Sequence, residues 1–148
     1  MADVDLSAAD AVAIVHEWLR DHPDTLTILG GPEHVSGLPE APWPHLVVSA
    51  APGGNPRNFV WSTEQAVNLE VWGSPDGSPG QASLWRKAVQ LAQRTKQLVD
   101  LEVDTTDPVV GRVGFSGVVN NAPTSAGQPR QTLGLLVVVH PPVSQPIP

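Results

Sequence analysis

The sequence predicts an α+β protein, with a mixed, mostly antiparallel sheet of about five strands and two helices packed on one face. Apolar residues recur at helical spacing in two segments, around residues 8–21 and 84–99. Other segments alternate between apolar and polar residues or run apolar over strand lengths, and loops rich in Gly and Pro separate them. Because the chain has 148 residues and no Cys, we expect one domain at 1–140 without disulfides, followed by a proline-rich arm at 141–148.

The first helix is expected to begin at a capping pattern, because Asp10 follows Ser7 by three residues. Its apolar face consists of Ala8, Ala11, Val12, Val15, Trp18 and Leu19. Pro23 should end the helix near residue 21, since proline lacks the amide that a helix interior needs. Short strands are then predicted at residues 25–29 and 45–49, and the Pro/Gly-rich segment after the second strand predicts an exposed turn or loop.

Residues 64–72 alternate strictly, which predicts a strand with one face in the core and one in water. The core face holds Gln65, Val67, Leu69 and Val71, and the water face holds Glu64, Ala66, Asn68, Glu70 and Trp72. The second helix has a stripe of Leu84, Ala88, Leu91, Thr95 and Leu98, flanked by Trp85, Ala92 and Val99. Residues 109–119 and 131–140 are predicted to be antiparallel partners, joined by a loop too long for a tight hairpin.

Charge is unevenly distributed along the chain, whose net charge is −7. The first fifty residues hold eight acidic side chains and one basic one, whereas the second helix is basic. Such a protein is a poor candidate for gripping nucleic-acid phosphates, which requires clustered Lys and Arg. The acidic start lacks the features of a signal peptide and no apolar run approaches a membrane span, so we expect a soluble cytoplasmic product without a membrane partner.

No motif predicts an enzyme, and we expect neither catalytic residues nor a cofactor. Residues 22–24, His-Pro-Asp, match the tripeptide of chaperone J-domains, which joins two helices, the first of them basic. Here an acidic helix precedes the tripeptide and a strand is expected after it, so a helix stop explains the same residues. Residues 114–117, Gly-Phe-Ser-Gly, lack the spacing and the following helix of a nucleophile elbow. Gly111, Gly114 and Gly117 instead permit a β-bulge or a close approach by another backbone.

Metal binding and carboxylate catalysis are not predicted either. The five histidines show no ligand spacing. Glu64 and Glu70 share a strand face, but six residues of strand separate them by roughly 20 Å. That distance is too long for a catalytic pair.

Tryptophan is the unusual residue of this composition, with five Trp, no Tyr and two Phe. Trp18 and Trp85 fall on the apolar stripes of the helices and are expected in the core. Trp43, Trp61 and Trp72 lie in or beside loops and the water face. Because Trp is enriched at the buried centres of interfaces, these three are candidates for a partner surface, with plain loop anchoring as the alternative.

The order of these elements resembles that of the tail terminator proteins of siphophages. The stretches that carry the resemblance are residues 11–20, AVAIVHEWLR, and residues 67–73, VNLEVWG, followed by the second helix and the final strands. The similarity covers roughly residues 5–140. It lies in the pattern of elements rather than in a diagnostic motif, so it carries no chemical role onto a particular residue.

The resemblance implies a non-enzymatic virion protein that forms a homohexameric ring at the junction of tail and neck. Such a ring ends the tail tube, binds the tail tube protein and a neck or head-completion protein, and lets DNA pass without specific binding. Its subunits meet through unlike surfaces, which the acidic first third and the basic second helix could supply. A head–tail connector or neck protein of the same virion is one alternative; a small α+β enzyme or ligand-binding domain with a polar pocket is another.

Two sets of residues are predicted to carry this function. The channel would be lined by Glu64, Asn68 and Glu70, whose charge would repel DNA phosphates. The subunit or tail-tube interface would include Trp43, Arg57, Trp61, Trp72, Arg86 and Lys87.

Overall fold

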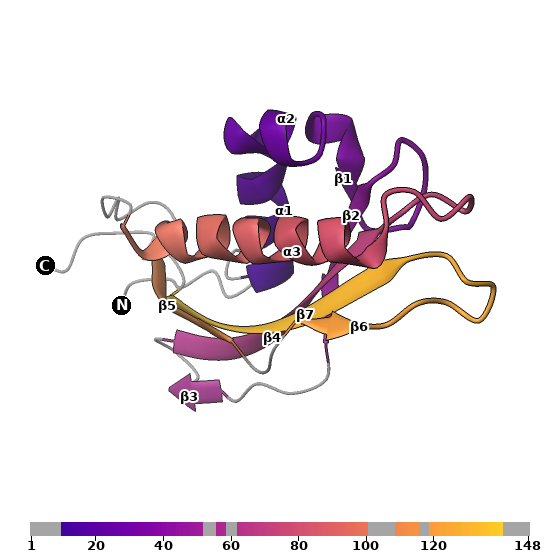
Figure 1. The fold of residues 1–148 in the computed structure, drawn as a ribbon. Helices are drawn as coiled ribbons and strands as arrows, with labels where there is room; N and C mark the ends of the chain where they lie inside the picture. Colours follow the sequence, from indigo (N-terminus) through magenta and orange to yellow (C-terminus); the bar gives the residue numbers. More distant parts are fainter. Residues whose placement is uncertain (1–9, 52–55, 59–61, 101–108, 116–118, 141–148) are drawn as a thin grey trace, which may run out of the picture.

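The computed structural model shows a sheet whose described helices all lie on one side (Figure 1). The residues described are 10–51, 56–58, 62–100, 109–115 and 119–140. The helices are α1 (Ala11–Asp21), α2 (Asp24–Ile28) and α3 (Gln81–Lys96), and the 3₁₀ helices are η2 (Pro32–His34) and η3 (Gln97–Asp100). The strands are β1 (Val35–Ser36), β2 (His45–Ala50), β3 (Pro56–Asn58), β4 (Ser62–Trp72), β5 (Val109–Phe115), β6 (Asn120–Asn121) and β7 (Arg130–His140).

The sheet has the order β1-β2-β4-β7-β5, with β3 paired to β4 and β6 paired to β7. Among the described strands, β1 and β2 pair in parallel and the other pairings are antiparallel. The predicted class, an α+β fold with a mostly antiparallel sheet, is therefore confirmed. Three strands of two or three residues, β1, β3 and β6, were not predicted, because runs this short give no periodic pattern.

The core lies between the sheet and the helices α1 and α3. Strand β4 buries Val67, Leu69 and Val71 on the helix side, as its alternation predicts. The predicted stripe of α3 is buried as well, from Leu84 to Leu98. β7, the strand next to β4, adds the buried residues Leu133, Leu135, Val137 and Val139.

The first helix begins later than its pattern suggested. Asp10 is the N-cap of α1, and its carboxylate accepts hydrogen bonds from the amides of Val12 and Ala13 at 3.0 and 3.2 Å. The predicted cap Ser7 lies outside the described residues. One cap oxygen thus satisfies two of the amides that the first turn leaves unpaired.

The strand predicted at residues 25–29 is wrong, since Asp24–Ile28 forms the short helix α2. The run Thr-Leu-Thr-Ile favours a strand, but contacts made by α3 at both ends of the segment hold it as a helix. At its start, Arg94 Nε lies 2.6 Å from an Asp24 carboxylate oxygen. At its end, Lys87 Nζ donates to the carbonyl of Ile28 at 2.7 Å. Tertiary contacts thus override local propensity here.

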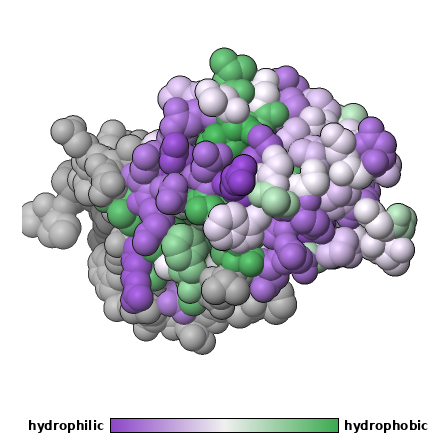
Figure 2. Space-filling view, viewed as in Figure 1, coloured by the Kyte–Doolittle hydropathy of each residue, from purple (hydrophilic) through white to green (hydrophobic). Residues whose placement is uncertain are grey.

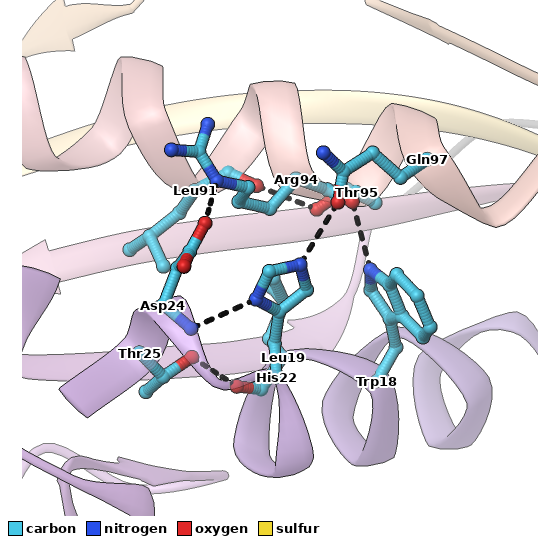
Figure 3. Close-up of polar contacts among 9 residues, drawn as sticks. All are labelled: Trp18, Leu19, His22, Asp24, Thr25, Leu91, Arg94, Thr95 and Gln97. Carbon is cyan, nitrogen blue, oxygen red and sulfur yellow. Dashed lines mark hydrogen bonds and ion pairs between the residues drawn. The ribbon is translucent and has the colours of Figure 1, made fainter. Parts of the chain in front are cut away.

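The His-Pro-Asp tripeptide fastens α1 and α2 to α3 (Figure 3). The Asp24 amide donates to Nδ1 of His22 at 3.0 Å, which leaves the opposite ring nitrogen, Nε2, to donate to the Gln97 side chain at 2.8 Å. Beside it, the indole N–H of Trp18 donates to the Arg94 carbonyl at 2.7 Å. A helix follows the tripeptide, where a strand was expected. The side chains of His22 and Asp24 nevertheless make contacts within the domain.

The strand predicted at 109–119 is present as β5 (Val109–Phe115), while residues 116–118 of the prediction lie outside the described residues and Val119 is not in a strand. Its register with β7 shifts between Val110 and Arg112, which is the bulge that the glycines favour. β5 is the outermost of the described strands on this side of the sheet, and β7 is its partner.

Candidate functional site

Glu64, Asn68 and Glu70 lie on the sheet face opposite the helices, as the alternation of β4 predicts. All three are intermediate between buried and exposed. The face is not uniformly wet, because Val47 and Val138, which pair with Glu70 and Glu64, are buried. Its polar character is therefore confined to part of the surface.

Glu70 belongs to a cluster rather than standing as an isolated charge. A carboxylate oxygen of Glu70 lies 3.7 Å from Arg130 Nη1, and only 20% of the Glu70 side chain is exposed. The Arg130 guanidinium lies 5.0 Å from the centre of the Trp72 ring and donates from Nε to the Ala122 carbonyl at 2.7 Å. The exposed Arg112 shares this face. The two arginines reduce the net negative charge of the face below what β4 alone suggests.

For three of the predicted interface residues, the structure describes only Trp43 together with its side chain. Trp61 lies outside the described residues, and for Arg57 only the backbone, in β3, is described. Trp43 is partly buried, with its ring edge-on to His45 at a centroid distance of 6.3 Å.

His45, at the start of β2, is the buried histidine of this region. It is fully buried, with Nδ1 3.3 Å from the Pro42 carbonyl oxygen and Nε2 2.7 Å from the Ser36 hydroxyl oxygen, and that hydroxyl donates to the Leu38 carbonyl at 2.9 Å. Burial lowers the pKa of His45, while the Pro42 contact and the charge of Glu40 act in the opposite direction. The ring is a structural group that favours its neutral form.

Arg86 and Lys87 are adjacent in sequence but differ in their surroundings. Arg86 is exposed on α3, as an interface residue should be. Lys87 points back to α2, where its ammonium binds the Ile28 carbonyl. The structure thus gives Lys87 a role within the subunit, besides the interface role that sequence reasoning proposed for both.

An apolar groove, which sequence reasoning missed, runs between α3 and the edge of the sheet. Its volume is about 360 Å³, and its lining residues are Trp85, Val89, Ala92, Gln93, Phe115, Val119 and Leu133. Trp85 is 48% exposed and Phe115 is 45% exposed, so the prediction that Trp85 is a core residue is wrong. In the space-filling view, hydrophobic residues gather along α3 over β5 and β7 (Figure 2).

The groove exists because the apolar residues of α3 extend further round the helix than the part that packs on β4 and β7. Leu84, Ala88 and Leu91 fill the contact with β4 and β7. Trp85 and Val89 form a second row, one residue further round the helix, above the outermost strand β5. Within the described part of the chain no strand lies beyond β5, and Trp85 of this row is 48% exposed. The signal was present in the sequence as two adjacent apolar rows, but the sequence does not say where the sheet ends.

The described residues provide no constellation for metal chemistry or membrane insertion. No group of three or more His, Asp or Glu residues among them is arranged to hold a metal ion. None of the helices in the described ranges is both long and apolar enough to cross a membrane. The groove, for its part, has only Gln93 as a polar lining residue, so it lacks the convergent polar groups that an active site requires.

No protein-family model and no curated protein matches the sequence. Among solved structures, the chain is similar to one from the virion of a native gene transfer agent particle, with a TM-score of 0.62. The match covers 90% of this chain and 96% of that chain at 18% sequence identity. At this identity the similarity concerns the fold, and it extends over nearly the whole of both chains.

Proposed function

We propose that this protein is a structural component of a phage-like virion, and that it acts as a tail terminator. In this proposal a homohexameric ring of the chain ends the tail tube and joins it to the neck, while DNA passes through its centre. The observation that supports it most is the similarity of fold, over nearly the whole chain, to a chain of a gene transfer agent virion. The family resemblance of the sequence narrows the role to the tail end.

The surface of the subunit suits assembly better than catalysis. A closed ring needs two unlike surfaces that fit each other. The acidic residues concentrated before residue 50 and the exposed Arg86 on α3 offer opposite charges for such a contact. The partners would be other copies of the chain, the tail tube protein and a neck or head-completion protein.

Removal of the protein from the particle distinguishes a terminator from a neck protein. Without a terminator, tail tubes should grow past their normal length and should not join heads. Without a neck protein, tails of normal length should accumulate beside filled heads. Electron microscopy of lysates with and without the gene measures both features. Tails of normal length that join heads in the absence of this protein would refute both roles.

The position of Glu64, Asn68 and Glu70 in the channel is part of the proposal. Glu64→Lys should slow DNA release, because a ring of lysines attracts phosphates. Glu64→Gln should have a smaller effect, and Gln90→Lys, on an exposed position of α3, should have none if the helices lie outside the channel. Glu70 is less suitable for this test, since a lysine there would face Arg130. Equal ejection rates for Glu64→Lys and wild-type particles would contradict the channel assignment.

A further inference from the structure

The apolar groove beside α3 has the dimensions and chemistry of a peptide-binding site. Two half-exposed aromatic residues, Trp85 of α3 and Phe115 of β5, line the groove together with Leu133 of β7. A volume of about 360 Å³ accommodates a few side chains of an extended segment. Lys96 covers part of the Phe115 wall, with its ammonium 5.0 Å from the ring centre.

The lining selects an uncharged, apolar occupant. Besides the indole N–H of Trp85, Gln93 is the one polar group among the described lining residues, and its side-chain amide can hydrogen-bond to the backbone of an occupant. Aromatic-lined grooves of this kind bind proline-rich segments, because such segments are already extended as a polyproline II helix and lose little entropy on binding. An acidic occupant would leave its carboxylates against apolar walls, with Lys96 as the nearby partner.

The chain itself contains a segment that fits these requirements. Residues 141–148, Pro-Pro-Val-Ser-Gln-Pro-Ile-Pro, contain four prolines and no charge. They follow directly after β7, the strand that also contributes Leu133 to the groove. We propose that the groove binds residues 141–148 of a second copy of this chain.

Reach favours a second copy over the same chain. His140 pairs with Val109, whereas Phe115 pairs with Leu135, so the near end of the groove lies five residues back along β7. Leu133 lies two residues further, about 23 Å from His140 at the rise of a strand. Residues 141–148 span at most about 25 Å as polyproline II, and reversing direction uses part of that length. Within one chain, residues 141–148 would use most of this length to reach Leu133, which leaves little to run along the groove.

A direct test measures binding of the isolated segment. A synthetic peptide of residues 141–148 is titrated into the protein that lacks them, and binding is followed by calorimetry and by the NMR signals of the Trp indoles. We expect saturable binding that Trp85→Ala weakens at least tenfold, as expected for an aromatic anchor. Leu26→Ala, which removes a 67% exposed side chain from α2, should leave binding unchanged. A peptide with all four prolines replaced by serine should not bind.

A cross-linking test identifies the chain that supplies the segment. The protein has no Cys, so introduced thiols are unique. Chains carrying Ile147→Cys and chains carrying Gln93→Cys are mixed under mild oxidation, with Leu26→Cys in place of Gln93→Cys as the control. A disulfide between copies for Gln93→Cys, and not for Leu26→Cys, supports the inference.

Two results would overturn the inference that the groove binds residues 141–148 of a second copy. One is the absence of peptide binding to folded protein, and the other is a disulfide that forms within a doubly substituted chain but never between copies. The inference does not depend on the proposed ring. If the peptide binds and the copies cross-link while particles lack the protein, the proposed function fails and the groove assignment stands.

Discussion

Arg86 and Lys87 allow a matched test of which basic side chain serves the fold and which serves assembly. The change is to Met in each case, which removes one positive charge and keeps an unbranched apolar stem. Lys87 Nζ donates to the Ile28 carbonyl at 2.7 Å and holds the end of α2. Arg86 is the exposed residue next to it on the same helix. The two variants therefore differ in contact but not in net charge.

The size of the effect follows from the hydrogen bond that is lost. Bonds to a charged group contribute about 1.5–3 kcal/mol, and a buried carbonyl left unpaired loses stability of similar size. Because the Lys87 bond is only partly buried, we expect Lys87→Met to lower the free energy of unfolding by about 1–2 kcal/mol. Arg86→Met should stay within about 0.5 kcal/mol of wild type. For a domain of this size, Tm should fall by about 2–8 °C in the first variant and by less than about 2 °C in the second.

Thermal and urea unfolding, followed by circular dichroism, measure these changes, and sedimentation of the protein with tail tube protein measures assembly. We expect Lys87→Met to lose stability and Arg86→Met to lose assembly at unchanged stability. If the two variants unfold at the same temperature, the α2 contact is not a stabilising one. If Arg86→Met assembles normally, Arg86 does not belong to the interface.

Two further predictions concern the loop after β4 and the histidine at the start of β2. Gly73→Ala should lower the free energy of unfolding by about 1–3 kcal/mol, because the added Cβ would lie 2.8 Å from the Pro79 carbonyl oxygen. Gly80→Ala should be close to neutral, since no atom lies within 4 Å of its Cβ. Equal Tm values for the two variants would contradict this prediction. His45 has a lowered pKa, so its contribution to stability is fully present above its ordinary value of 6.5 and is lost as the pH falls below that value toward the folded-state pKa. Unfolding measured from pH 7.5 to 4.5 should therefore show a steeper loss in wild type than in His45→Gln, and parallel curves would refute the assignment.

The sequence predicts best those elements whose apolar residues repeat with a regular period and pack against one other layer of the fold. The alternation of β4 predicted which side chains face the helices, because a strand in the middle of a sheet has both its faces fixed by that sheet. The stripe of α3 predicted its buried side for the same reason. In both cases the local period and the tertiary contact agree.

Two errors have one physical origin, which is contact with residues distant in sequence. Residues 25–29 have the composition of a strand, yet Arg94 and Lys87, about sixty to seventy residues later, hold the ends of a helix there. Trp85 lies beside a buried stripe, yet β5 is the outermost described strand on that side and the ring is half exposed. The pairing of Glu70 with Arg130 likewise joins two strands and could not be read from either alone.

Electron cryomicroscopy of intact particles would show whether this chain forms the proposed ring at the end of a virion tail. We expect density for six copies of this fold around the channel where the tail tube meets the neck, with the sheet face that carries Glu64 toward the DNA and α3 outside. Particles that lack the chain, or that contain it as a single copy or away from the tail tube, would contradict this role.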